Sequence, residues 1–139
     1  MINSSEEEKK AALDKLKIGS ESLIYKTLAS KGDKTGPLIA VIPITSHLDE
    51  KKLAAVSGNK RTEMLPLKEL QKTTGYIHGA NNPVGIWHRS HGKFPIFFDK
   101  QAIKDGRIYV SAGELGRSDG IDAKQVADFI KAEFADLTA

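Results

Sequence analysis

The chain has 139 residues, of which 40% are hydrophobic and 28% charged, with a formal net charge of +3. This is the composition of one ordinary globular domain, which we place at residues 1–139. The absence of cysteine excludes disulfides, thiolate nucleophiles and cysteine-type zinc sites. The sequence shows neither a bilayer-length apolar run nor an N-terminal signal peptide, so we expect a cytoplasmic protein that does not engage a membrane.

The first half of the chain predicts helices and strands in alternation. The expected elements are a helix at 4–17, strands at 23–29 and 38–44, a short helix after Asp49 that Gly58 ends, and a strand at 61–65. The two longer strands are joined by a polar turn at 31–36, which predicts a hairpin.

The second half predicts a short helix at 67–72, strands at 95–98 and 107–112, and a last helix that Asp122 and Gln125 cap. Val126, Phe129, Ile130 and Phe134 would form the core-facing stripe of that helix. Several connections between strands are too short for parallel crossovers. We therefore predict a mixed α+β fold with a largely antiparallel, barrel-like sheet and surrounding helices.

Residues 70–98 contain no aspartate or glutamate, although the chain has 18 such residues. At their centre, residues 75–85 hold three glycines, two asparagines and a proline, so the backbone can adopt conformations closed to most sequences. An acid-free loop flanked by cations can offer N–H groups to a phosphate or a carbonyl oxygen. The alternative is an ordinary surface loop that happens to lack acids.

Lys26 falls on the predicted first strand, where alternation puts it on the same face as Ile24 and Leu28. A lysine on an apolar face is either a gatekeeper on an edge strand or a charge aimed into a pocket, and spacing alone favours the gatekeeper. A third hypothesis is a carbonyl enzyme that uses Lys26 as a Schiff base.

Ser111 ends a hydrophobic strand and precedes a glycine-containing loop, a common place for ligand contacts. The alternative is a serine that bonds only to the local backbone, and no Gly-x-Ser-x-Gly elbow surrounds it. His88 and His91 are three residues apart, but without neighbouring carboxylates or cysteines we predict no metal site. His78 either lines the ligand site or makes a structural hydrogen bond.

Three motifs in order resemble the YbaK/EbsC family of free-standing aminoacyl-tRNA deacylases, which is related to the editing domain of prolyl-tRNA synthetases. They are Tyr25-Lys26-Thr27-Leu28, then Thr73-Thr74-Gly75-Tyr76 leading into Gly79-x-x-x-Pro83-x-Gly85, and Val110-Ser111-Ala112-Gly113. The similarity covers nearly the whole chain. Gly-Ala-Asn-Asn-Pro and Ser-Ala-Gly-Glu-Leu-Gly-Arg-Ser resemble the branch that clears cysteinyl-tRNA(Pro).

The resemblance assigns roles to individual positions. It implies that Lys26, Gly79 and Ser111 serve catalysis: the lysine would hold the terminal adenosine's phosphate, and the loop backbone would polarise the ester carbonyl. A substrate thiol, a ribose hydroxyl or water would then attack, because the family supplies no side-chain nucleophile. The expected substrate contacts are Tyr25, His78, Ala80, Pro83 and Gly113. The cations of the acid-free window, Lys72, Arg89 and Lys93, are the expected tRNA contacts.

The resemblance thus predicts an enzyme, a hydrolase or a lyase, that removes a misattached amino acid, with cysteine expected, from tRNA(Pro). It implies no cofactor, no DNA partner, and prolyl-tRNA synthetase as a candidate partner. Complete relatives begin with an extra N-terminal strand that carries a pocket aromatic, and this chain is expected to lack it. The alternative function is therefore a non-catalytic module of the same fold that binds tRNA or a synthetase.

Overall fold

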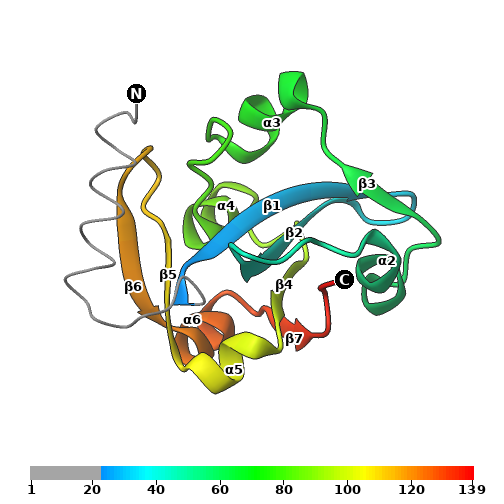
Figure 1. Ribbon diagram of the computed structural model, residues 1–139. Helices are drawn as coiled ribbons and strands as arrows, with labels where there is room; N and C mark the ends of the chain where they lie inside the picture. Colours follow the sequence, from blue (N-terminus) through cyan, green and yellow to red (C-terminus); the bar gives the residue numbers. More distant parts are fainter. Residues whose placement is uncertain (1–22) are drawn as a thin grey trace.

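The computed structural model describes residues 23–139, so the helix predicted at 4–17 lies outside the described residues. Within the described part, the main sheet has the strand order β3-β1-β2-β4-β7, and β5 and β6 form a separate hairpin (Figure 1). The strands of the sheet are β1 (Tyr25–Gly32), β2 (Gly36–Pro43), β3 (Thr62–Met64), β4 (Ile96–Asp99) and β7 (Glu133–Ala135). The hairpin consists of β5 (Arg107–Ser111) and β6 (Ser118–Asp122), and the helices are α2 (Glu50–Ser57), α3 (Leu67–Thr74), α4 (Pro83–Arg89), α5 (Gln101–Asp105) and α6 (Ala123–Phe129).

The sheet is mixed, which confirms the predicted α+β class. The pairs β1/β2, β1/β3 and β5/β6 are antiparallel, and the predicted hairpin at 31–36 is confirmed, with Gly32 opposite Gly36. The pairs β2/β4 and β4/β7 are parallel. These parallel pairs are possible because long stretches that contain helices separate their strands along the chain.

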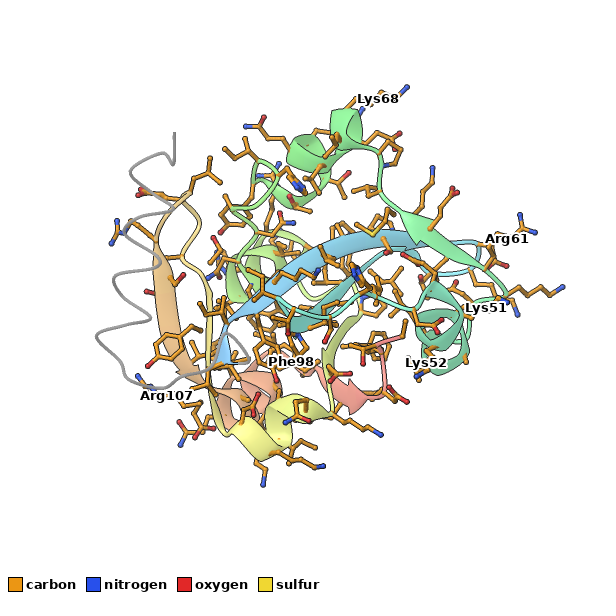
Figure 2. All side chains as sticks on the ribbon, in the orientation of Figure 1. Lys51, Lys52, Arg61, Lys68, Phe98 and Arg107 are labelled. Atoms are coloured by element: carbon orange, nitrogen blue, oxygen red, sulfur yellow. The ribbon has the colours of Figure 1, made fainter. Side chains whose placement is uncertain are left out.

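Alternation along β2 divides the core into two clusters on opposite faces of the sheet. Ile39 and Val41 belong to the larger cluster, which α3, α4, α5, α6 and β5 cover. Leu38, Ala40 and Ile42 belong to the smaller cluster, which Leu53 of α2 and the C-terminal segment cover. In Figure 2, Phe98 lies inside the molecule, whereas labelled cations such as Arg61 and Lys68 lie at its periphery.

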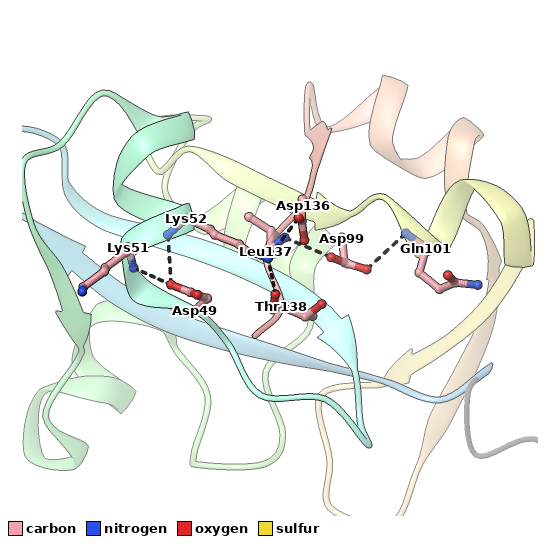
Figure 3. A network of polar contacts seen from close by, with 8 residues as sticks. All are labelled: Asp49, Lys51, Lys52, Asp99, Gln101, Asp136, Leu137 and Thr138. Carbon is pink, nitrogen blue, oxygen red and sulfur yellow. Dashed lines mark hydrogen bonds and ion pairs between the residues drawn. The ribbon is translucent and has the colours of Figure 1, made fainter.

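The C-terminal segment is held in place by side chains that bond to its backbone and to the Asp136 carboxylate (Figure 3). Asp99 accepts from the N–H of Leu137 at 3.0 Å, and Lys52 of α2 donates to Asp136 at 3.0 Å and to the carbonyl of Thr138 at 2.7 Å. The Lys52 contact also lowers the pKa of the Asp136 carboxyl. These bonds hold the last residues against α2 and β4, where Leu137 is fully buried.

Three predicted helix caps are confirmed. Asp49 accepts from the N–H groups of the first turn of α2, and Gly58 ends that helix in the left-handed region at φ 79°. Asp122 accepts from Gln125 N at 2.9 Å and so begins α6.

The predicted apolar stripe of the last helix is wrong in part. The helix ends at Phe129, and Lys131 takes φ 56°, which breaks the helical path. Phe129 is 63% exposed, and Phe134 lies on β7, where it packs edge-on against Phe98 at 5.8 Å between ring centroids. Ile130 is buried and Val126 packs against the core, as predicted, and the buried positions within α6 are Ala123 and Ala127.

The loop predicted at residues 75–85 is also wrong in part, because the helix α4 begins at Pro83 and includes Gly85 and His88. None of the helices over residues 23–139 has the length and apolar character needed to cross a membrane.

Candidate functional site

Lys26 lies on a strand that has neighbours on both sides. Its Cα pairs with Ile42 of β2, and alternation puts its half-buried side chain on the same face as Leu28, as predicted. Beside β1, on the side away from β2, lie β3 near one end and the bridge from Ile24 to Tyr109 of β5 near the other. Between these two contacts, at Lys26, no second strand of the described residues 23–139 pairs with β1, so the gatekeeper and pocket interpretations of Lys26 both stay predictions.

The strands β1 and β5 start side by side and then diverge. They meet at the parallel bridge between Ile24 and Tyr109, and Lys26 and Ser111 each lie two residues beyond it. Figure 1 shows α4 and the loop before it in the space between the diverging strands. The structure thus brings the backbone around Lys26, the glycine loop and Ser111 into one region.

Two consecutive asparagines tie the loop to both strands. The side-chain amide of Asn81 donates to the carbonyl of Thr27 at 3.0 Å, on the residue after Lys26. The amide of Asn82 donates to the carbonyl of Ser111 at 2.8 Å. The loop that ends at Pro83 therefore has a fixed position relative to both strand segments.

Gly79 is exposed and has φ +86°, a conformation that L side chains rarely adopt. Its main chain faces the side chain of Leu115, since an added Cβ would lie 3.2 Å from Leu115 Cδ2. The neighbouring His78 is also exposed, whereas Ala80 and Pro83 are buried and pack the loop onto the core. Of these residues, His78 and Gly79 are the ones accessible to a ligand.

Ser111 is half-buried at the end of β5, and its hydroxyl accepts from the N–H of Gly113 at 3.4 Å. This is the local backbone contact that the alternative interpretation described. Gly113 has φ +93°, and an added Cβ there would lie 3.1 Å from the ring of Tyr76. Tyr76 also fills the space beside Gly85, where an added Cβ would overlap its hydroxyl. The ring of Tyr76 thus packs between α4 and the loop after β5.

Tyr25 does not join this group. It is 2% exposed, packs in the larger core cluster and donates its hydroxyl to Asp105 Oδ2 at 2.7 Å. Alternation puts its side chain on the opposite face of β1 from Lys26. Burial and the adjacent Asp105 carboxylate raise the pKa of Tyr25 far above its usual value, so its hydroxyl stays protonated. These contacts explain Tyr25 as a structural residue, and we do not carry it into the site.

The predicted tRNA contacts lie on or just after the helices that flank the loop. Lys72, Arg89 and Lys93 are all exposed, and Arg89 reaches the carbonyl of Lys72 at 3.5 Å. His88 and His91 are exposed as well, and over residues 23–139 no group of three or more metal-ligating side chains comes together. This surface therefore presents cations and imidazoles without a metal-binding geometry.

Sequence reasoning missed three residues of this region. Asn81 and Asn82 were treated as loop formers, although an asparagine directly before a proline is a signal for a helix N-cap followed by proline at N1. Thr27 is 8% exposed, and its hydroxyl has no hydrogen-bond partner within the described part of the chain. An unpaired buried polar atom is costly, and native structures carry few of them. No pattern in the sequence indicates Thr27.

The fold and the site define a class of protein: a small mixed α+β domain in which a glycine loop is held between two diverging strands. The family model described as "Aminoacyl-tRNA editing domain" matches residues 6–129. The chain belongs to the aminoacyl-tRNA editing domain family, and the predicted family resemblance is confirmed.

Among curated proteins, the chain is 43% identical over 115 residues to a protein of Enterococcus faecalis named "Putative Cys-tRNA(Pro)/Cys-tRNA(Cys) deacylase EbsC", covering 83% of this chain and 68% of that protein. Among solved structures, one hypothetical protein matches with a TM-score of 0.80 at 22% identity, over 94% of this chain and 83% of that chain. Another, described as "a putative trans-editing enzyme for prolyl tRNA synthetase", matches with a TM-score of 0.74 at 18% identity, over 100% of this chain and 99% of that chain. These two structures establish the similarity of fold.

Proposed function

We propose that this protein is a trans-editing deacylase that removes a misattached amino acid, cysteine above all, from tRNA(Pro) in the cytoplasm. The observation that carries this proposal is the 43% identity to the enterococcal protein named as a Cys-tRNA(Pro)/Cys-tRNA(Cys) deacylase. The geometry agrees with it, since the Gly79 loop is tied to the strands that carry Lys26 and Ser111. A prolyl-tRNA synthetase is the candidate partner that would deliver the tRNA.

In this proposal Lys26 holds the phosphate of the terminal adenosine, and main-chain N–H groups of the loop around Gly79 donate to the ester carbonyl oxygen. Fixed donors of this kind stabilise the negative charge that develops as the carbonyl carbon is attacked. The bond from that carbon to the ribose oxygen then breaks, and the ribose oxygen takes up a proton and leaves with the tRNA.

The nucleophile comes from outside the protein's side chains. The chain has no cysteine, and no Gly-x-Ser-x-Gly elbow surrounds Ser111. Attack by water releases the free amino acid, as in a hydrolase. Attack by the thiol of a bound cysteine releases a cyclic thioester, as in a lyase, and analysis of the released product distinguishes the two.

The function is tested with a panel of tRNA(Pro) charged with cysteine, alanine or proline, together with Cys-tRNA(Cys), by measuring loss of each ester above its uncatalysed rate. We expect the fastest loss from Cys-tRNA(Pro) and little from Pro-tRNA(Pro). Tight tRNA binding without acceleration of any ester would contradict the enzyme and support the non-catalytic module.

Binding of tRNA should weaken steeply with salt if Lys72 and Lys93 contact phosphates, because each neutralised phosphate releases counterions. Reversing both charges (Lys72→Glu with Lys93→Glu) should lower affinity and flatten the slope of log K against log salt by roughly 1 to 2. The control, Lys51→Glu with Lys60→Glu, makes the same net change at exposed positions near α2 and should keep the wild-type slope. A salt-independent affinity in the unmodified protein would point to a small ligand instead of tRNA.

A further inference from the structure

The pair Asn81-Asn82 connects the glycine loop to two strands that are far apart in sequence. Asn81 lies 54 residues from its partner Thr27, and Asn82 lies 29 residues from its partner Ser111. Adjacent residues of one chain thus hold the carbonyls of β1 and β5 at a set separation. Both partners are close to positions proposed for catalysis: Thr27 follows Lys26 in the chain, and Ser111 is itself such a position.

Asn82 makes two different hydrogen bonds, one with each polar atom of its side chain. Its Oδ1 accepts from Gly85 N at 2.8 Å and so caps α4, whereas its Nδ2 donates to Ser111 O at 2.8 Å. The first bond stabilises a helix end. The second has no part in the helix and fixes the end of β5 against the loop.

Asn81 is the more deeply buried of the two, at 6% exposed, and is bonded at both ends. It donates to Thr27 O and accepts from Thr74 Oγ1 at 3.2 Å, and Thr74 is fully buried. Loss of its amide would leave buried groups unpaired and destabilise the fold. Asn82 is half-buried and is the better position for a test.

We propose that Asn82 is a positioning residue for deacylation, which sets the distance between the Gly79 loop and the strand end at Ser111. The inference rests on the proposed function. The reason is that helix capping needs only a side-chain oxygen, which aspartate or serine would supply equally well. The Nδ2 group of Asn82, which donates to Ser111 O, is therefore not explained by capping. A misplacement of about 1 Å between groups that act on one ester can cost on the order of a hundredfold in rate.

The test uses Asn82→Asp and Asn82→Ser. Both keep an oxygen for Gly85 N–H. Aspartate has no donor for Ser111 O, and serine has a single, shorter hydroxyl at the cap in place of the separate Oδ1 and Nδ2 of asparagine. We expect the melting temperature to stay within a few degrees of wild type, whereas the single-turnover rate on Cys-tRNA(Pro) falls about tenfold to a hundredfold with a small change in tRNA affinity. The serine variant is neutral, so its loss of rate cannot come from repulsion of an anionic substrate.

Asn59→Asp is the matched control. Asn59 is another bridging asparagine, which accepts from Lys34 N and Thr35 N and donates to Ser57 Oγ at 2.8 Å, close to the β1–β2 turn. The same chemical change there should lower stability without changing the rate per folded molecule.

A double-mutant cycle with Ser111→Ala separates positioning from a structural role. If Asn82 acts through Ser111, Asn82→Ser should cost much less in the Ser111→Ala background than alone, because the two changes affect one unit. Effects that multiply independently, or an unchanged rate in folded Asn82→Ser protein, would overturn the inference. A wild-type protein that clears no ester would overturn the proposed function, and this inference with it.

Discussion

Lys26→Ala is expected to reduce deacylation of Cys-tRNA(Pro) by about tenfold to a hundredfold, because a charge-assisted contact to a phosphate contributes roughly 1.5 to 3 kcal/mol. The fold should survive, since the side chain is half-buried on the face of the smaller core cluster and its loss removes only packing of the stem on neighbours such as Leu28. The measurement is single-turnover loss of the ester, with the melting temperature as a check of folding.

Lys31→Ala is the matched control on the same strand. Lys31 pairs with exposed Glu63 at 3.8 Å near the other end of β1, and such a surface pair contributes little to stability. It should therefore leave turnover unchanged.

Lys26→Arg tests the chemistry, because arginine keeps the positive charge but cannot form a Schiff base. Substantial activity in Lys26→Arg, without an adduct on borohydride treatment of the wild type, supports the phosphate role. A trapped adduct at Lys26 would favour the carbonyl enzyme. Near-normal activity in folded Lys26→Ala protein would remove Lys26 from the site altogether.

Local sequence signals predicted local structure well. The turn between β1 and β2 and the caps at Asp49 and Asp122 depend on residues a few positions apart, and all are present in the structure. The helix α4 was missed even though Asn82-Pro83 is a cap signal, because the neighbouring glycines indicated a loop. Gly85 lies within the helix for a packing reason: its missing Cβ makes room for Tyr76.

The arrangement of the site could not be read from local patterns. The bridge between Ile24 and Tyr109, and the bonds from Asn81 and Asn82, join segments whose separation in the chain carries no periodic signal. The family resemblance predicted that Lys26, Gly79 and Ser111 belong to one site, and this stays a prediction. It also included Tyr25, whose burial against Asp105 depends on tertiary contacts that no short motif contains.

Gly79→Ala is expected to have the largest effect on the proposed chemistry. With no nucleophilic side chain proposed, much of the rate must come from backbone donors, and loss of one such donor costs about 3 kcal/mol, or on the order of a hundredfold or more in rate. An alanine at φ +86° is strained, and its Cβ would lie 3.2 Å from Leu115 Cδ2. The loop must therefore move its N–H groups, while phosphate contacts elsewhere keep most of the tRNA affinity.

Gly36→Ala provides the control for backbone strain. Gly36 has φ +71° at the β1–β2 turn, and an added Cβ there meets nothing within 4 Å. It should lose stability without losing turnover. Combining Gly79→Ala with Leu115→Ala relieves the steric contact but not the strain, so a rate that stays low assigns the effect to the backbone conformation.

Pro83→Ala, which loosens the loop at the start of α4, should show the same pattern as Gly79→Ala more mildly. If Gly79→Ala weakened tRNA binding yet left single-turnover deacylation intact, the loop would be a binding element, and the ester carbonyl would have to be polarised by other groups.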